Sequence, residues 1–216
     1  MATLKDKHLP VVKNLYYGEK MSMQSVASRL GISIDAVSYF MRRHRLERRS
    51  VLENEVIKFD KKPLSYRLKN KLSTFENKLK LAGIMLYWGE GYKTIKSKGI
   101  DFANSDVSMI VAFINFLRQI CGVDERRLRV LLYCYSNQNP ESLIDFWSKL
   151  TKIPKSQFTK PYVRHDFHPD KEGKMKYGMV HIRYSDKKLL TLLLEWIDEF
   201  KREYCVDGGV VNRTTL

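Results

Sequence analysis

Residues 23–50, MQSVASRLGISIDAVSYFMRRHRLERRS, constrain the fold more than any other stretch of the chain. Two short apolar patterns flank Gly31, with the small Ala27 four residues before it and Val37 and Phe40 after it. A small side chain lets two helices cross closely, and glycine accepts the positive φ of a tight turn. The stretch therefore predicts two short helices joined as a helix-turn-helix.

The second helix of this pair is expected to begin after Ser33, which is suited to cap its N-terminus. In helix-turn-helix proteins this part of the second helix reads base edges in the major groove. Residues 42–49 then hold five arginines, which suit phosphate contacts. The module resembles resolvase-like and sigma-factor-like helix-turn-helix modules, and a small structural helical hairpin is the alternative. The candidate DNA-binding residues here are Ser33, Asp35, Ser38, Tyr39, Arg42, Arg43, Arg45, Arg48 and Arg49.

Charge points to the same kind of partner. The 216 residues include 39 Lys plus Arg against 24 Asp plus Glu, a formal net charge of +15. Such an excess favours binding to a polyanion through counterion release, although a merely solvated basic surface is the alternative. No apolar run approaches the roughly 18–20 residues of a membrane span, and the N-terminus lacks a signal-like segment, so a cytoplasmic protein is expected. Three scattered cysteines predict reduced thiols.

The remaining pattern divides the chain into four parts. A helix-turn-helix domain is expected at 1–50, a basic linker at 51–74, a larger α+β domain at 75–205 and a C-terminal tail at 206–216. The larger domain should open with a helix, followed by a hairpin around KTIKSKG and a strand. The next predicted elements are an amphipathic helix, a strand, a helix, a strand pair and a last helix after Ser185. The expected fold class is thus α+β, with helices covering one face of a sheet.

Alternation along the predicted strands separates two sheet faces. The apolar set expected to face the helices is Leu128, Val130, Leu132, Val180, Ile182 and Tyr184. The other face interleaves cations with aromatic rings and could lie against a DNA groove, with an ordinary solvated face as the alternative. Its candidate DNA-binding residues are Arg127, Arg129, Tyr133, Lys160, Tyr162, Arg164, His181 and Arg183, joined by Lys93, Lys96 and Lys98 from the hairpin.

A family resemblance rests on residues 85–91, MLYWGEG, and on the order of elements around them. Over about residues 75–203 the chain resembles the LAGLIDADG homing-endonuclease fold, an αββαββα-type domain with one sheet face open to DNA. The resemblance implies that Glu90 holds the catalytic metal, Mg²⁺ or another divalent cation, and that Gly91 matches the terminal glycine of the motif. His165 and His168 form a weaker metal candidate, because no further ligand set stands at zinc spacing.

One Glu90 per chain is too little for double-strand cleavage, so the resemblance implies a homodimer through the 76–90 helix. Ala82, Gly83 and Gly89 would let two such helices approach closely. Glu90 and Lys98 are the candidate catalytic residues, and Lys93, Lys96 and Arg129 are the alternatives to Lys98 as the cation that assists catalysis. The expected function is a sequence-specific, Mg²⁺-dependent, homing-type endonuclease of double-stranded DNA. The alternatives are a non-catalytic DNA-binding transcriptional regulator on the same scaffold and, less favoured, an RNA-splicing helper.

Overall fold

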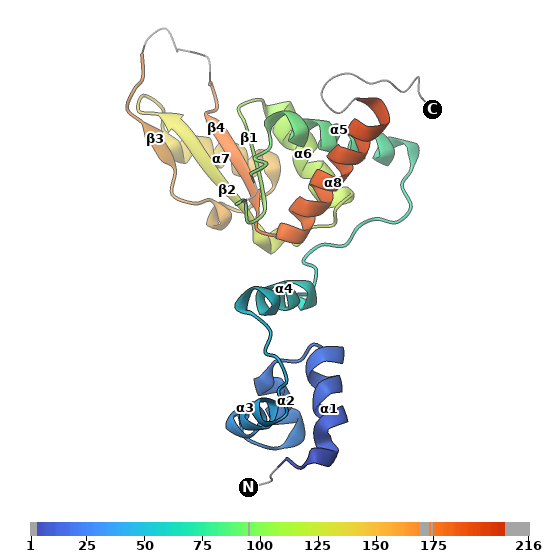
Figure 1. Ribbon diagram of the computed structural model, residues 1–216. Coiled ribbons are helices and arrows are strands. Elements are labelled where there is room, and N and C mark those ends of the chain that lie inside the picture. Colours follow the sequence, from blue (N-terminus) through green and yellow to red (C-terminus); the bar gives the residue numbers. More distant parts are fainter. Residues whose placement is uncertain (1–3, 95, 169–172, 174, 206–216) are drawn as a thin grey trace. The chain divides into compact units, whose positions relative to one another are not determined.

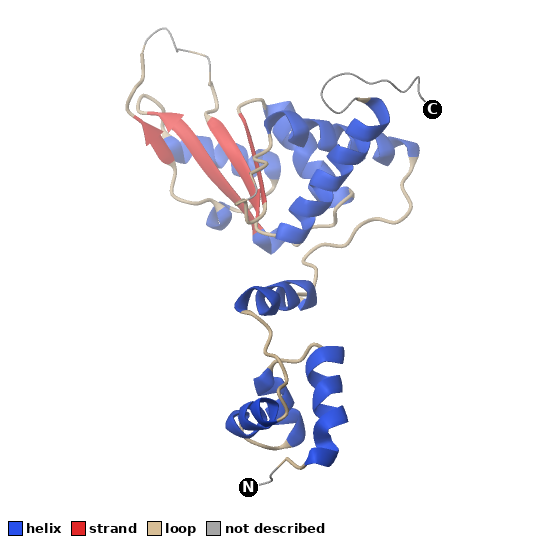
Figure 2. Ribbon diagram, in the orientation of Figure 1, coloured by secondary structure: helices blue, strands red, loops and turns tan. Residues whose placement is uncertain are grey.

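The computed structural model describes residues 4–94, 96–168, 173 and 175–205 (Figures 1 and 2). The chain divides between Pro63 and Leu64 into two compact units, which are described separately here as the N-terminal and the C-terminal unit. This boundary lies inside the stretch that was expected to be a linker, so residues 51–74 are shared between the two units instead of forming a separate segment.

The N-terminal unit consists of short helices around a small core. Their bounds are η1 Asp6–His8, α1 Leu9–Lys13, η2 Asn14–Gly18, α2 Met23–Leu30, α3 Ile34–Arg43 and α4 Val51–Lys61. Gly31 ends α2 with a φ of 65°, and the Ser33 hydroxyl accepts a hydrogen bond of 3.1 Å from the Ala36 amide. Ala27, Val37 and Phe40 are buried. The predicted turn, its cap and the packing of the two helices are confirmed.

Helix α4 belongs to the N-terminal unit, and the residues after Pro63 belong to the C-terminal one. A capping box between Ser50 and Glu53 begins α4, and near its end Lys61 donates to the Glu19 carbonyl over 2.8 Å. The chain then lies along the C-terminal unit, where the Arg67 amide donates to the carbonyl of Cys121 over 3.1 Å. These long-range hydrogen bonds explain why no independent linker forms at 51–74.

The C-terminal unit alternates helices with the strands of one mixed sheet. Its elements are α5 Thr74–Glu90, β1 Ile100–Asn104, α6 Val107–Gln119, η3 Glu125–Arg127, β2 Leu128–Tyr135, α7 Pro140–Thr151, η4 Lys155–Gln157, β3 Tyr162–Arg164, β4 Met179–Tyr184 and α8 Lys187–Tyr204. The strand order is β1-β4-β2-β3, with β4 antiparallel to both of its neighbours and β3 parallel to β2. The chain is an α+β protein, as predicted.

Two predicted strand pairings are wrong. Strand β3 pairs in parallel with β2 instead of forming a hairpin with β4. Two parallel strands need a crossover connection, and α7 supplies it between β2 and β3. The hairpin expected before β1 is reduced to a single bridge between Gly91 and Phe102. The described residues of this segment, 91–94 and 96–99, are therefore mostly loop, and they do not form the second strand that the order αββα requires.

The core of the C-terminal unit lies on one face of the sheet, between the sheet and its helices. All six apolar residues assigned to this face from strand alternation are buried: Leu128, Val130, Leu132, Val180, Ile182 and Tyr184. They pack with Phe113 and Phe116 of α6 in one cluster. On α6 itself Ile110 and Ile114 are buried, whereas Met109 is exposed. The opposite sheet face thus remains open between its flanking loops.

None of the helices in the described ranges combines the length and the apolar character needed to cross a bilayer. Cys121 and Cys134 are buried and Cys205 is partly exposed, and all three carry free thiols. Burial raises the pKa of the Cys121 thiol to about 12. This thiol is therefore protonated at neutral pH and has little nucleophilic character.

Candidate nucleic-acid interface

Helix α3 presents a polar face opposite its buried residues. Asp35, Tyr39 and Arg42 are exposed and follow one another at i, i+4 and i+7, so they form one row along the helix. Tyr39 has 62% of its surface exposed. Ser38 is half-buried, and its hydroxyl accepts a hydrogen bond from the Arg48 guanidinium. This row is the surface that a base-reading helix would present to a groove.

The five arginines of residues 42–49 have different environments. Arg42, Arg43, Arg45 and Arg48 are exposed, and Arg43 also lies 3.3 Å from the Asp6 carboxylate. Arg49 folds inward: its guanidinium lies 4.1 Å above the Tyr16 ring and donates to the Met21 carbonyl. The prediction that Arg49 contacts DNA is corrected accordingly, because its side chain packs within the unit and anchors the basic segment.

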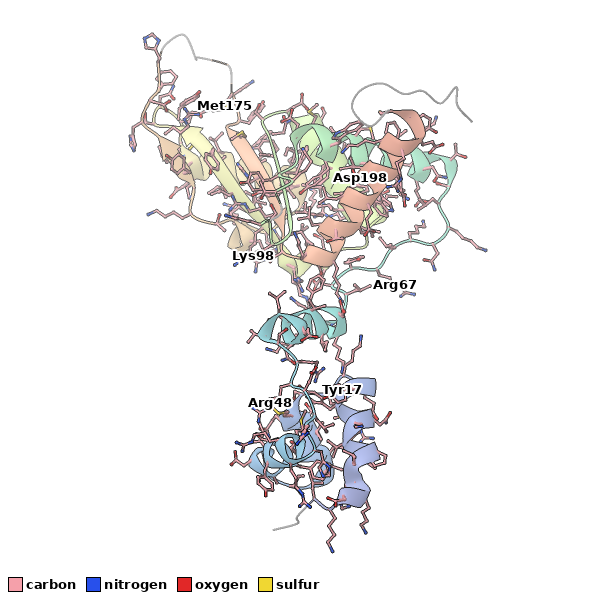
Figure 3. The ribbon with its side chains drawn as sticks, in the orientation of Figure 1. Tyr17, Arg48, Arg67, Lys98, Met175 and Asp198 are labelled. Carbon is pink, nitrogen blue, oxygen red and sulfur yellow. The ribbon has the colours of Figure 1, made fainter. Side chains whose placement is uncertain are left out.

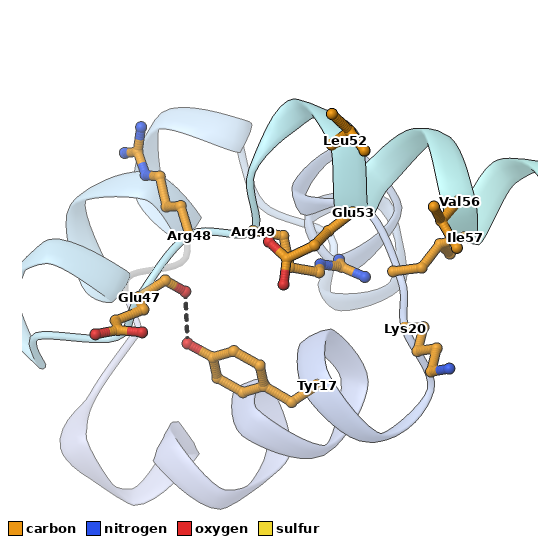
Figure 4. Close-up of a pocket in the computed structure, with 9 residues that line it drawn as sticks. All are labelled: Tyr17, Lys20, Glu47, Arg48, Arg49, Leu52, Glu53, Val56 and Ile57. Carbon is orange, nitrogen blue, oxygen red and sulfur yellow. Dashed lines mark hydrogen bonds between the residues drawn. The ribbon is translucent and has the colours of Figure 1, made fainter.

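A groove of about 490 Å³ separates α4 from this basic segment (Figure 4). Tyr17 (Figure 3) donates from its hydroxyl to the Glu47 carbonyl over 2.6 Å, and the Arg49 amide donates to the Tyr16 hydroxyl over 3.0 Å. On the other side of the groove α4 leaves Leu52 with 77% of its surface exposed. The two tyrosines thus fix the backbone on both sides of Arg48, which projects from a fixed position.

The open sheet face of the C-terminal unit carries rows of side chains that cross its strands. Arg183 of β4 stands between Asp101 of β1 and Arg129 of β2 in the strand register. His181 precedes Arg183 by two residues on β4, and its ring lies 4.8 Å from the ring of Tyr133. The cations and aromatic rings assigned to this face from alternation are therefore brought together on it.

Asp101 was not among the predicted site residues. Its Oδ1 lies 2.7 Å from His181 Nδ1, and its Oδ2 accepts a hydrogen bond of 2.8 Å from Arg183 Nε. Burial alone would raise the pKa of this carboxyl, but the hydrogen bonds and charges of His181 and Arg183 outweigh it, so the pKa lies below its ordinary value. The sequence did contain a signal for this position: in the strand IDFAN, alternation with the buried Phe102 places Asp101 on the open face.

Several predicted DNA-binding cations have partners within the chain. Arg127 belongs to the short turn η3, not to the strand; it donates to the Ser185 carbonyl and lies 5.5 Å from the Tyr184 ring centre. Arg164 forms an ion pair of 2.6 Å with Asp166. The expectation that Arg127 lies on the strand face is wrong, because the strand begins one residue later. Lys96, Lys98 (Figure 3) and Lys160 are exposed.

Lys93 and Glu90 share the end of α5. The Lys93 ammonium donates to the carbonyls of Trp88 and Gly91, each over 2.8 Å, and so satisfies the C-terminal end of the helix. Glu90 is the last residue of the helix and is exposed, without an ion pair in the described part of the chain. The structure thus places the acid at the surface and assigns the neighbouring cation a capping contact.

The three small residues of α5 do not share one environment. Ala82 and Gly89 are exposed and line a groove of about 530 Å³ between α5 and α6, together with Met85, Leu86, Glu90, Ser108, Met109 and Ala112. Gly83 is buried, and a Cβ there would lie 2.1 Å from the Phe116 ring. The prediction of Gly83 at a dimer interface is therefore wrong, because it packs against α6 of its own chain.

A divalent cation would find few ligands within a single chain. Over residues 4–94, 96–168, 173 and 175–205, no group of three His, Cys, Asp or Glu side chains is arranged to hold a metal. Glu90 offers one carboxylate, whereas Mg²⁺ takes six oxygen ligands and is commonly held by one or two carboxylates with phosphate oxygens. One chain alone therefore does not fit a metal centre. His165 and His168 do not complete one either.

The fold and these surfaces define a two-unit α+β chain with an exposed helix row and an open, cation-bearing sheet face. No protein-family model, curated protein or solved structure matches it. Its function is therefore inferred from its own residues.

Proposed function

We propose that this chain binds double-stranded DNA in a sequence-specific manner. The observation that carries the proposal is the exposed row of α3, Asp35, Tyr39 and Arg42, with a fixed basic segment directly after it. Base edges are recognised by side chains on such a helix, while nearby arginines neutralise phosphates. The net charge of +15 supports a polyanionic partner.

The open sheet face supports a second DNA contact in the same chain. Arg129 and Arg183 lie side by side there, with His181 and Tyr133 beyond them. Among the described residues, Asp101 is the one carboxylate in contact with this group, and its two oxygens contact His181 and Arg183. A surface with more cations than anions suits phosphates, and the aromatic rings suit contacts with sugars or base edges.

A homodimer formed through α5 is part of the proposal. Ala82 and Gly89 are exposed on this helix and leave room for close approach, and Met85 and Leu86 add apolar surface to the same groove. An interface of this kind joins the same patch of two copies about a two-fold axis. The dimer would then read a site with approximate two-fold symmetry.

A homing-type endonuclease is the second candidate, and the exposed Glu90 favours it. This carboxylate ends α5 beside the groove lined by Gly89, so pairing of two α5 helices would bring two Glu90 side chains together. Two carboxylates with phosphate oxygens meet the needs of Mg²⁺, which one chain does not. Lys98 is exposed and remains the candidate to stabilise phosphate charge. A DNA-binding regulator without cleavage is the alternative.

Selection of bound duplexes from a random library tests the DNA-binding proposal. We expect a preferred site to emerge with the wild-type chain and to be weakened about tenfold in Arg42→Gln, because a phosphate or base contact is lost. Glu203→Gln on α8 is the control for an exposed charge change and should retain the preference. Enrichment of no sequence by the wild-type chain contradicts sequence-specific binding.

Cleavage is tested with plasmids that carry the flanks of the chain's own coding sequence, with and without Mg²⁺. For the endonuclease we expect Mg²⁺-dependent cutting that Glu90→Gln abolishes while duplex affinity stays within about twofold. Duplex binding without cutting, in Mg²⁺ and in Mn²⁺, identifies the regulator instead.

A further inference from the structure

Two arginines on the open sheet face stand directly opposite each other. Arg129 of β2 and Arg183 of β4 are register partners in an antiparallel pair. Side chains so placed have Cβ atoms about 4.5–5.5 Å apart, and like charges there are destabilising. On the far side of Arg183 stands Asp101, also in register. The row across three strands therefore holds two cations and a single anion.

Both guanidinium groups are held by the chain on one side only. Arg129 Nη1 donates to the carbonyls of Arg126 and Leu128, each over 2.7 Å. Arg183 donates from Nε to Asp101 over 2.8 Å, and its side chain remains 39% exposed. These contacts leave further N–H groups of both arginines available. They also restrict the side chains, which lowers the entropy lost when a ligand binds.

The surroundings of this arginine pair suit a tetrahedral oxyanion. A groove of about 330 Å³ adjoins Arg183 on its Asp101 side and is lined further by Tyr92, Ser97, Lys98 and Ser185, whereas Arg129 stands on the other side of Arg183 in the strand register. Guanidinium groups bind phosphate through parallel N–H···O bonds, and Lys98 adds a point charge nearby.

We infer that Arg129 and Arg183 form a clamp for one phosphate group, with Asp101 orienting Arg183. An anion bound between the two guanidinium groups would offset the electrostatic repulsion between Arg129 and Arg183. This inference deepens the proposed function and rests on it for the source of the phosphate. Under the proposed function, the phosphate belongs to the backbone of a bound polynucleotide. Free inorganic phosphate shares the chemistry and is the other source.

Thermal unfolding of the full chain in inorganic phosphate tests the clamp itself. At matched ionic strength, replacing chloride by phosphate should raise the melting temperature of the wild-type chain, because a ligand that binds the folded state stabilises it. In Arg129→Gln the apparent phosphate dissociation constant should rise about tenfold. Lys149→Gln, which removes an exposed charge on α7, is the matched control and should respond as the wild type does.

Arg129→Lys makes the test independent of a folding defect in the glutamine variant. It keeps the charge but loses the planar fork, so phosphate stabilisation should fall while circular dichroism stays unchanged. A full phosphate response in Arg129→Lys and Arg129→Gln overturns the clamp. An equal loss of phosphate stabilisation in Arg129→Gln and Lys149→Gln also overturns the clamp, since it reduces the effect to overall charge.

Duplex titration separates the clamp from the proposed function. On duplex of random sequence, Arg129→Gln should lower the slope of log affinity against log salt concentration by about 0.9, the value for one lost phosphate contact. An unchanged slope with normal duplex binding overturns the clamp and leaves DNA binding standing. Phosphate stabilisation that depends on Arg129 in a chain that binds no duplex supports the clamp and contradicts the proposed function.

Discussion

At the scale of single residues, the position of Asp35 has a consequence for DNA binding. It lies in the exposed row of α3 and has no ion-pair partner within the described ranges. A carboxylate there repels phosphates, and it can accept hydrogen bonds from the amino group of cytosine. Under the proposed DNA-binding function, Asp35 would therefore contribute to specificity instead of affinity.

Replacing Asp35 by Asn should strengthen non-specific binding and weaken base preference. Loss of one repulsive charge should raise affinity for random duplex by about two- to fivefold at low salt. Discrimination at one base pair of the selected site should fall by about 1–3 kcal/mol. Fluorescence anisotropy with selected, mutated and random duplexes measures both effects. Unchanged affinity for all three would show that Asp35 does not face the DNA.

Asp101 is the second residue whose charge state has a measurable effect. Because its pKa is lower in the folded chain than its ordinary value of 3.8, the ionised carboxylate stabilises the fold. That contribution is complete above the ordinary value and is lost as the pH falls toward the lowered pKa. His181 and Arg183 are the partners that stabilise the ionised form.

Asp101→Asn should therefore cost about 2 kcal/mol of the free energy of unfolding at pH 7, the scale of a hydrogen bond to a charged group. The difference from the wild type should stay constant down to about pH 5 and shrink below pH 4. Urea unfolding at several pH values, followed by the fluorescence of the chain's tryptophans, measures it. A difference that grows on acidification would contradict the assigned pKa shift.

At the scale of elements, α5 has one glycine facing the core and one facing outward. A Cβ at Gly83 would lie 2.1 Å from the Phe116 ring, whereas a Cβ at Gly89 would meet nothing within 4 Å. Both residues belong to the same helix, so their intrinsic backbone costs are similar. They form a matched pair in which packing alone differs.

Gly83→Ala should destabilise the chain by about 1–3 kcal/mol, because the added methyl group overpacks the contact between α5 and α6. Gly89→Ala should be neutral or stabilise it by up to about 1 kcal/mol, as alanine is the better helix residue. Urea titration of the two variants and the wild type measures the contrast. Equal effects would mean that the close contact with Phe116 does not limit the site.

At the scale of the whole molecule, the proposed homodimer would connect the groove on α5 to the proposed DNA recognition. Two copies joined through the groove of Ala82 and Gly89 would carry two α3 helices and two open sheet faces. A two-fold dimer binds a two-fold site with the contacts of both halves, so loss of the dimer should weaken binding far more than loss of one contact.

Ala82→Glu should shift the chain to a monomer in sedimentation velocity, because two like charges would face each other across the axis. Affinity for the selected site should fall at least about tenfold, while binding to a half-site should change little. Asn77→Glu, an exposed change on the other side of α5, is the control. A wild-type chain that remains monomeric with and without DNA would contradict the dimer.

Most of the helices and strands could be predicted from local signals along the chain. Apolar periodicity, capping residues such as Ser33 and Ser73, and strand alternation act within a few residues of the positions that they organise. For this reason the helix pair around Gly31, the turn between its helices and the buried side of the sheet are found where they were predicted, whereas α4 lies in the stretch that was predicted to be a linker. The exposed row of α3 followed from the same periodicity.

Contacts between residues far apart in the chain could not be predicted from such local signals. The pairing of β3 with β2 depends on where α7 packs, and the contact of Asp101 with His181 joins residues 80 positions apart. Whether a small residue of α5 faces inward, as Gly83 does, depends on the rotation of the helix against α6. Long-range packing selects one of several arrangements that local patterns permit equally, and this selection placed the Asp101 carboxylate against His181 and Arg183 on the open face.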